Sequence, residues 1–299
     1  MELVTAIITT YKRPINIVKR AVESVLSQTY PKIELIVVND SPTEKYLVNN
    51  IAILLESYKR NIKYIVHKKN LGACAARNTG LKAAHGRFIA FLDDDDEWIP
   101  EKIEDQIKYM NDRVELVYCA SYIISGDKTK IHYPRYPKKN IFRELLKCNY
   151  IGSTSFPLLR TDCLKKLGGF DTNLESCQDY DMWLRVLEKG SAAYVGKPLV
   201  RYYISHDSTF KKDNKKFING EQYLSNKHKE LYRLYPKSYS YHLNEMALNG
   251  LIKKDINMYI FYKTKAWRFK WFSYYNFLML PKKLVDKLKE YINFNHLFK

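Results

Sequence analysis

The sequence has few cysteines, and their spacing does not fit a disulfide framework or a zinc site. Five cysteines occur in 299 residues, and no two of them are separated by only two residues. An odd number of widely spaced cysteines is typical of a chain that folds in a reducing compartment. We therefore expect neither a disulfide framework nor a structural zinc ion.

Long apolar runs are also absent. No apolar stretch approaches the roughly 18–20 residues that a membrane-spanning helix needs. Residues 3–8 begin a strand-like pattern almost at once, with no basic segment before it and no small-residue cleavage site after it. The sequence therefore predicts no signal peptide and no membrane-spanning helix.

Acidic residues are fewer than basic ones. The chain has 50 Lys and Arg residues against 32 Asp and Glu residues, a net charge of +18. Residues 207–299 hold 19 Lys and Arg residues but only 8 Asp and Glu residues. A basic C-terminal third indicates a polyanionic partner, either nucleic acid or an anionic membrane surface. A solvated basic surface without a partner would also explain the charge.

Hydrophobic residues make up 46% of the chain, enough for a sizeable core, and their pattern alternates between strands and helices. Strands are predicted at residues 3–8, 33–38, 62–66 and 87–92, and helices at residues 14–27, 44–58 and 74–84. This alternation predicts an α/β fold with a Rossmann-like, mostly parallel central sheet. Further strands are predicted at residues 115–121, 155–159, 192–195 and 199–204. Further helices are predicted at residues 100–110, 141–148 and 161–167, and another helix begins near residue 179. Residues 122–140 are predicted to form a surface loop or hairpin. The C-terminal third is predicted to be helical, at residues 220–234, 238–251, 255–270 and 281–292.

Four consecutive carboxylates, Asp93 to Asp96, follow the apolar run 88–92 directly. A short apolar run of this kind is typical of a buried strand, and ligands of open α/β sheets bind beyond the carboxyl ends of the strands. Clustered carboxylates select hard divalent cations. Charge runs are often only solvated turns, but the buried strand before this one favours a ligand site.

Several short motifs in order carry a family resemblance. The sequence resembles family-2 glycosyltransferases with the GT-A fold, which are nucleotide-diphospho-sugar transferases. The resemblance covers residues 4 to about 206, whereas residues 207–299 resemble no family that we can name. The matching stretches are residues 6–14 (AIITTYKRP), 21–30 (AVESVLSQTY), 34–40 (ELIVVND), 70–78 (NLGACAARN), 91–98 (FLDDDDEW) and 178–185 (QDYDMWLR).

The resemblance implies a metal-dependent nucleotide-sugar site. It places a divalent cation, Mn²⁺ or Mg²⁺, on Asp93 and Asp95, with Asp94 between them in the donor site. It places His206 near the metal or the diphosphate, although a lone histidine is more often structural. The remaining residues that it assigns to the nucleotide are Thr9, Tyr11, Arg13, Asp40 and Arg77. A surface position is the alternative for Arg77, and a helix-capping role is the alternative for Asp96.

The resemblance also implies the catalytic base. Asp179 would take the proton of the acceptor hydroxyl. The preceding residue is Gln178 where the family has glutamate, which puts the local hydrogen bonding of this motif in doubt. Asp181 could support the site from behind, but we favour a role at the start of the helix.

The function predicted from the sequence is an inverting, metal-dependent glycosyltransferase of the hexosyl- or N-acetylhexosaminyl-transferase type. It would move a sugar from a nucleotide-diphospho-sugar, with a UDP-sugar favoured, to a glycan or lipid-linked acceptor in cell-surface polysaccharide synthesis. The catalytic domain would be residues 1–206, and the enzyme would be cytoplasmic and peripheral on the inner face of the cell membrane. The absence of glycine from residues 9–13 argues against a nucleotidyltransferase. A basic nucleic-acid-binding or scaffold protein on a catalytically silent GT-A fold is the alternative, but we expect no nucleic-acid partner.

Aromatic and basic residues alternate in residues 259–277 of the basic, helical C-terminal region, 207–299. Such rings settle at the headgroup level of membranes, and basic residues are attracted to anionic lipids. We therefore predict that residues 255–292 lie on an anionic membrane surface. The alternative is that these aromatic residues pack in a core or in a homodimer interface.

Overall fold

The computed structural model describes residues 1–204, 214–253 and 255–269, and the chain divides into two compact units. The first unit consists of residues 1–136 and 150–214, and the second of residues 137–149 and 215–299. Each unit is described separately. The predicted domain boundary after residue 206 falls outside the described residues and stays a prediction.

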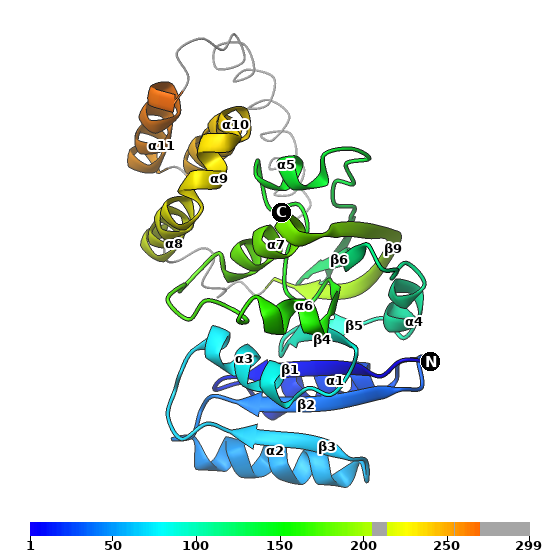
Figure 1. Ribbon diagram of the computed structural model, residues 1–299. Coiled ribbons are helices and arrows are strands. Elements are labelled where there is room, and N and C mark those ends of the chain that lie inside the picture. The colour runs from blue at the N-terminus through cyan, green and yellow to red at the C-terminus, as the bar shows by residue number, and fades with distance from the viewer. Residues whose placement is uncertain (205–213, 254, 270–299) are drawn as a thin grey trace. The chain divides into compact units, whose positions relative to one another are not determined.

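In the first unit, nine strands of the described chain form one sheet (Figure 1). Their order is β3-β2-β1-β4-β8-β6-β9-β5, and β7 pairs with β6. The strands are β1 (Val4–Thr10), β2 (Ile33–Asn39), β3 (Ile62–Val66), β4 (Phe88–Asp93), β5 (Glu97–Trp98), β6 (Val114–Ser125), β7 (Lys128–His132), β8 (Leu158–Arg160) and β9 (Ser191–Tyr203).

The first four strands are parallel to one another, and antiparallel pairs occur only in the other half of the sheet. β1 pairs with β2 and β4, and β2 pairs with β3, all in parallel. β8 lies antiparallel between β4 and β6, whereas β6 and β9 are parallel. The predicted α/β fold is therefore confirmed, and its parallel half follows from helical crossovers between consecutive strands.

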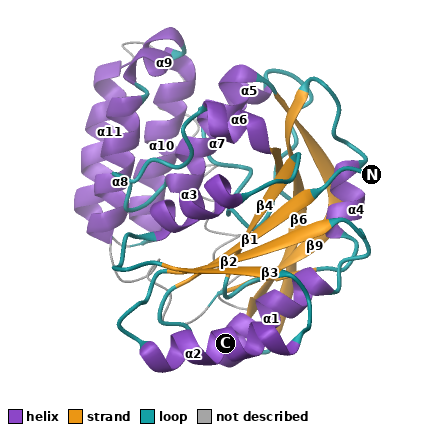
Figure 2. Ribbon diagram, turned by 60° about the horizontal axis from the view of Figure 1, so that its bottom comes forward, coloured by secondary structure: helices purple, strands orange, loops and turns teal. Residues whose placement is uncertain are grey.

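Helices of the first unit cover both faces of the sheet (Figure 2). Val18, Val22 and Val25 of α1 pack on alternate residues of β1, and Ile51 and Leu55 of α2 extend the same cluster. α1 and α2 thus lie on one face, and α3, α6 and α7 lie on the other. The helices are α1 (Ile15–Leu26), α2 (Lys45–Ser57), α3 (Ala73–Ala83), α4 (Lys102–Ile107), α6 (Thr161–Lys166) and α7 (Gln178–Lys189).

A glycine allows α3 to lie very close to the sheet. A Cβ atom at Gly80 would come within 2.6 Å of the Ile7 side chain of β1. A larger residue would push the helix outward, because the Ile7 side chain is completely buried. This contact holds α3, which carries Arg77, against the centre of the sheet.

One predicted pair of strands is wrong. Residues 192–195 and 199–204 were expected to form two strands, but β9 is continuous from Ser191 to Tyr203. The irregular segment at Gly196 and Pro198 is absorbed by shifts of register against Cys119 and Ala120 of β6. A bulge of this kind bends a strand without ending it. The hairpin considered for residues 122–140 is present as the β6–β7 pair, which turns at Gly126.

The second unit is helical in its described part. The expected helix 220–234 is instead two helices, which meet at His228, and the expected helix 281–292 lies outside the described residues. A buried contact of 2.9 Å joins His242 and Glu221, and Tyr232 stacks on Tyr239 with ring centroids 4.2 Å apart. The helices are α5 (Ile141–Leu145), α8 (Asn214–Lys227), α9 (Lys229–Leu234), α10 (Pro236–Ile252) and α11 (Ile256–Phe269).

Among the residues that the structure describes, no helix has both the length and the apolar character needed to cross a bilayer. The five cysteines are free thiols.

Candidate active site

The acidic segment begins at the end of β4 and turns at once. Asp93 is the last residue of β4 and lies beside Thr9 of β1 in the parallel register. The Asp96 N–H donates to the Asp93 carbonyl over 3.0 Å and closes the turn. Because β1, β2 and β4 are parallel, their carboxyl ends, including Thr10 and Asn39, meet at one edge of the sheet, as the sequence predicted.

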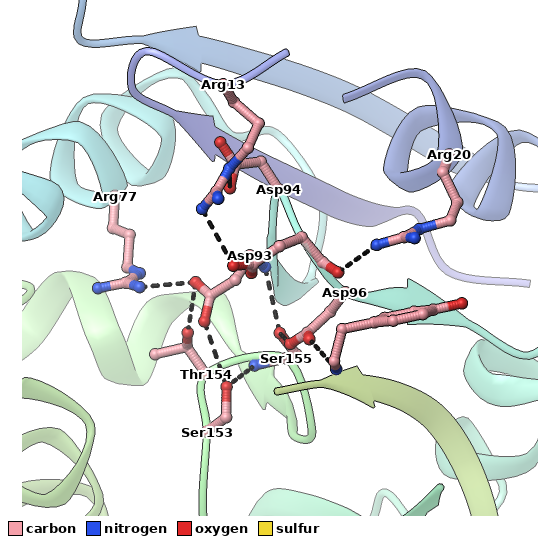
Figure 3. Close-up of polar contacts among 11 residues, drawn as sticks. Arg13, Arg20, Arg77, Asp93, Asp94, Asp96, Ser153, Thr154 and Ser155 are labelled. Carbon is pink, nitrogen blue, oxygen red and sulfur yellow. Dashed lines mark hydrogen bonds and ion pairs between the residues drawn. The ribbon is translucent and has the colours of Figure 1, made fainter. Parts of the chain in front are cut away.

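Asp93 is held by one arginine and two hydroxyl groups (Figure 3). Arg77 Nη2 and Thr154 Oγ1 donate to Asp93 Oδ1 over 2.7 and 3.1 Å, and Ser153 Oγ donates to Oδ2 over 3.2 Å. Burial alone would raise the pKa of Asp93, but the Arg77 charge and these hydrogen bonds outweigh burial and lower it. Asp93 is therefore kept ionised.

Arg13 holds the next two carboxylates. Its Nε donates to Asp94 Oδ1 over 2.9 Å, and its Nη2 donates to Asp95 Oδ2 over 3.0 Å. Asp94 is buried, and burial raises its pKa to about 6 against the opposing charge of Arg13. The pKa of Asp95 is raised by burial and by the negative charge of Asp93. Negative charge is thus in excess around Asp93, a situation that a bound cation would relieve.

Asp96 points into the protein and does not cap a helix. Its carboxyl group accepts from Ser155 Oγ over 2.6 Å and from the Tyr203 N–H over 3.2 Å. Burial, reinforced by the charge of Asp93, raises its pKa well above the ordinary value. The capping role considered for Asp96 is wrong, because α4 begins only at Lys102 and Asp96 joins the ends of β4 and β9 instead.

Arg20 was not singled out from the sequence. It lies on α1, where a basic residue is typical of a solvent-facing position. In the structure its guanidinium carbon lies 3.7 Å from the centroid of the Tyr203 ring, and its Nη2 donates to the Asp95 carbonyl over 2.6 Å. Arg20 thus ties the acidic turn to the end of β9.

Asp179 lies in the first turn of α7 and is partly buried. One of its carboxylate oxygens accepts the Tyr180 N–H over 2.7 Å. The pKa of Asp179 is raised to about 6, chiefly by burial and in smaller part by the Asp93 charge, against the lowering effects of the Tyr180 N–H and the Arg77 charge. Arg77 therefore lies within electrostatic reach of both Asp93 and Asp179.

Asp181 is completely buried and lies in the first turn of α7, the position at the start of the helix that we favoured from the sequence. Its Oδ2 accepts from Arg185 Nε over 2.9 Å. Arg185 also donates to the carbonyls of Leu167 and Gly169 over 3.0 and 2.9 Å. The pair therefore fastens α7 to the turn after α6. The Gln178 side chain, where the family has glutamate, donates to the Leu174 carbonyl over 3.2 Å.

We expect Asp181→Asn to destabilise the fold by about 3–5 kcal/mol, because it leaves the charge of Arg185 without its buried partner. Urea unfolding followed by circular dichroism measures this change. Asp162→Asn is the matched control, because Asp162 pairs with Lys166 at the same four-residue spacing but on the surface. Equal stability losses in the two variants would contradict the structural role of Asp181.

The residues expected to bind the nucleotide lie near this edge but differ in accessibility. Tyr11 is 48% exposed, and Thr9 is partly buried. Asp40 is buried and accepts the N–H groups of Leu71 and Gly72 over 2.8 and 2.7 Å. Its Oδ1 also lies 2.7 Å from His67 Nδ1. The Asp40 carboxylate thus orders the loop before α3, and its nucleobase contact stays a prediction. His206 lies outside the described residues.

Sequence reasoning did not single out Ser153, Thr154 and Ser155, which contact Asp93 and Asp96. They lie about sixty residues beyond the acidic segment, and Ser155 was expected at the start of a strand, whereas β8 begins only at Leu158. Only their position just before the short strand β8, which is antiparallel to β4, brings them under the acidic turn.

Asp93 and Asp95 would supply only part of the ligand shell of a divalent cation. Asp93 and Asp95 offer hard oxygen ligands, and among the described residues no three or more His, Cys, Asp or Glu side chains are grouped to hold a metal ion. Mg²⁺ and similar ions are commonly bound by one or two carboxylates, with water and substrate phosphates completing the shell. The donor set therefore suits a cation that arrives together with a phosphorylated ligand.

This chain is similar in sequence to known glycosyl transferases. A family model described as "Glycosyl transferase family 2" matches residues 5–168. WcaA of Escherichia coli K12, named as a glycosyl transferase of colanic acid biosynthesis, is 32% identical over 228 residues, which cover 74% of this chain and 79% of WcaA. WfaP of Escherichia coli, named as a UDP-Glc:alpha-D-GlcNAc-diphosphoundecaprenol beta-1,3-glucosyltransferase, is 34% identical over 69% of this chain and 78% of its own. Some relatives are longer, and the matched region covers only 35% of them.

Solved structures share the fold. The mannosyltransferase PcManGT of Pyrobaculum calidifontis, in complex with GDP-Man and Mn²⁺, superposes with a TM-score of 0.64. The match covers 99% of this chain and 84% of that protein at 15% sequence identity. At this identity the likeness shows a common architecture.

Proposed function

Since the chain belongs to glycosyl transferase family 2, we propose that it is an inverting, metal-dependent glycosyltransferase that uses a nucleotide-diphospho-sugar donor. The GT-A fold and the glycosyltransferase class expected from the sequence are confirmed. The observation that supports the finer proposal is the position of Arg77, which contacts Asp93 and lies within electrostatic reach of Asp179. In this proposal, the carboxylate that would hold the cation and the carboxylate that would act as the base lie near the same guanidinium group.

The donor that we propose is a UDP-sugar carrying a hexose or an N-acetylhexosamine. WfaP, a relative that matches most of this chain, is named for UDP-Glc. The exposed ring of Tyr11 could lie against the nucleobase, and Thr9 and Asp40 lie at the same edge. Arg13 and Arg77 would bind the phosphates, because one guanidinium group is positively charged and can donate two parallel hydrogen bonds to phosphate oxygens.

In the proposed reaction the acceptor hydroxyl oxygen attacks the anomeric carbon of the donor sugar and forms the new C–O bond. The bond from that carbon to the diphosphate breaks, and its electron pair leaves with the diphosphate. Asp179 takes the proton of the attacking hydroxyl. Direct displacement inverts the configuration at the anomeric carbon. A divalent cation bound by Asp93 and Asp95 would neutralise negative charge on the departing diphosphate.

A donor screen tests the proposal. Purified protein is incubated with Mn²⁺ and each of a series of UDP-, GDP- and TDP-sugars, and the released nucleotide is measured. We expect release from one or a few UDP-sugars and none after chelation of the metal. Release from no donor, together with a salt-sensitive gel shift with RNA, would instead favour the nucleic-acid-binding alternative.

The acceptor that we propose is a lipid-linked glycan in cell-surface polysaccharide synthesis, at the inner face of the cell membrane. WfaP is named for a diphosphoundecaprenol acceptor, and WcaA is named for colanic acid biosynthesis. An enzyme that meets such an acceptor gains from binding the membrane surface itself. α11 supports this idea, because Ile256, Ile260 and Phe261 are exposed.

We expect the full-length protein to float with anionic vesicles at low salt and to be released at high salt. A variant that ends at Phe269 should float much less, because it keeps α11 but lacks residues 270–299 and their six lysines, each of which contributes about 1 kcal/mol near an anionic surface. This variant keeps α11, whose Met258 and Tyr262 are buried, so the second unit retains its described core. If neither protein floats, the C-terminal aromatic residues belong to a core or to a homodimer interface.

A further inference from the structure

Three consecutive hydroxyl residues contact both ends of the acidic segment, Asp93 and Asp96 (Figure 3). Ser153 and Thr154 donate to the two oxygens of Asp93, at 3.2 and 3.1 Å. Ser155 Oγ accepts the Asp93 N–H over 3.1 Å and donates to Asp96 Oδ2 over 2.6 Å. We call Ser153, Thr154 and Ser155 the hydroxyl cradle.

The cradle is fixed at both ends by buried tryptophans. Trp183 Nε1 donates to the Gly152 carbonyl over 2.9 Å, and Trp98 Nε1 donates to the Ser155 carbonyl over 3.0 Å. Both indole rings are at most 1% exposed. Trp183 lies on α7, the helix that carries Asp179, so the cradle connects the acidic turn to the helix of the proposed base. Hydroxyl groups held this firmly can dictate how a carboxylate is turned.

The hydrogen bonds of Asp93 distinguish its two oxygens. Oδ1 accepts from both Arg77 and Thr154, whereas Oδ2 accepts only from Ser153, over a long 3.2 Å, within the described residues. A carboxylate oxygen has two lone-pair directions. Oδ2 therefore keeps one direction open to a cation. Arg77 is positive and would be repelled by a cation, but the hydroxyl groups are neutral and can keep their contacts.

We propose that the hydroxyl cradle positions Asp93 so that Oδ2 faces the divalent cation, and that it thereby sets the affinity of the protein for that cation. This inference rests on the proposed metal-dependent function. Groups that orient a metal ligand typically change metal affinity about 10–100-fold when they are removed. The members of the cradle are thus positioning residues, and they act through Asp93.

The test is Thr154→Val, which keeps the shape of the buried side chain and removes the hydroxyl group. Titration calorimetry with Mn²⁺ in the presence of UDP should show a roughly 10–100-fold larger Kd for the metal than in the natural protein. Thr154→Ser, which keeps the hydroxyl, should bind Mn²⁺ nearly as well as the natural protein. At saturating Mn²⁺, the kcat of Thr154→Val should recover most of its loss, because the chemical groups are intact.

Each outcome decides one question. If the natural protein binds no Mn²⁺ with UDP, the proposed function fails and this inference fails with it. If the natural protein binds Mn²⁺ and Thr154→Val binds it as tightly, the inference is overturned while the proposed function stands. If Thr154→Val does not fold, Ser153→Ala replaces it, because Ser153 is partly exposed and contacts Oδ2 directly. Unchanged metal affinity in that variant would overturn the inference equally.

Discussion

Asp179→Asn is expected to lower kcat by about 10²–10⁴ while the fold and donor binding persist, because a positioned general base typically contributes this much. Asparagine has nearly the same shape but cannot take the proton of the acceptor hydroxyl. Donor binding should persist, since Asp93, Arg13 and Arg77 are untouched. Single-turnover transfer and UDP calorimetry measure the two quantities separately.

The comparison variant is Asp181→Asn, measured per folded molecule. Because Asp181 pairs with Arg185 and is completely buried, its replacement should cost stability and much less of the chemical rate. The reverse ranking of rates would make Asp181 the base.

The pH dependence provides a second measurement on the same group. A base acts in its ionised form, and burial disfavours that form, so burial raises the pKa of Asp179 to about 6. The rate of the natural protein should therefore fall as pH drops through about 6, by about tenfold for each further pH unit. The residual activity of Asp179→Asn should lack this fall.

Asp95→Ala is expected to abolish detectable transfer and the metal-dependent part of donor binding. A hard cation would lose one of the two carboxylates that the described chain offers it. Calorimetry with a UDP-sugar and Mn²⁺, and turnover in the same buffer, measure both effects.

Asp112→Ala is the control for Asp95→Ala, because Asp112 is a fully exposed aspartate whose weak contact with Arg160 spans 3.9 Å. This variant should behave like the natural protein. Unchanged donor affinity and turnover in Asp95→Ala would end the assignment of Asp95 to the metal.

The sequence predicts the framework of the site well because its signals are local. The apolar runs that end at Thr10, Asn39 and Asp93 define parallel strands, and parallel strands end at one edge. The position of Arg77 on a helix after a glycine turn is equally readable. These features can be predicted from the periodicity of apolar residues and from the glycines and prolines that end helices and strands.

The features that the sequence did not predict depend on contacts between segments that are distant in the chain. Arg20 reads as a basic residue on the outer face of a helix, yet it stacks on Tyr203. Asp96 reads as a helix cap, but Ser155 and the Tyr203 N–H draw it inward. Likewise, residues 192–195 and 199–204 were expected as two strands, but β9 is continuous because its pairing with β6 accommodates the irregular segment between them by register shifts. No local pattern encodes such pairings.

The arginine contacts of the acidic turn bear on how the spent nucleotide leaves. Arg13 and Arg77 form ion pairs with Asp93, Asp94 and Asp95. In the proposed reaction an incoming metal–nucleotide complex must displace these pairs, so part of its contact energy is offset by those that are lost. When the nucleotide departs, the same ion pairs can form again and offset part of the contact energy that is lost with it. A site that closes on itself in this way holds its product less tightly than a bare acidic pocket would, which favours rapid turnover where product release limits the rate.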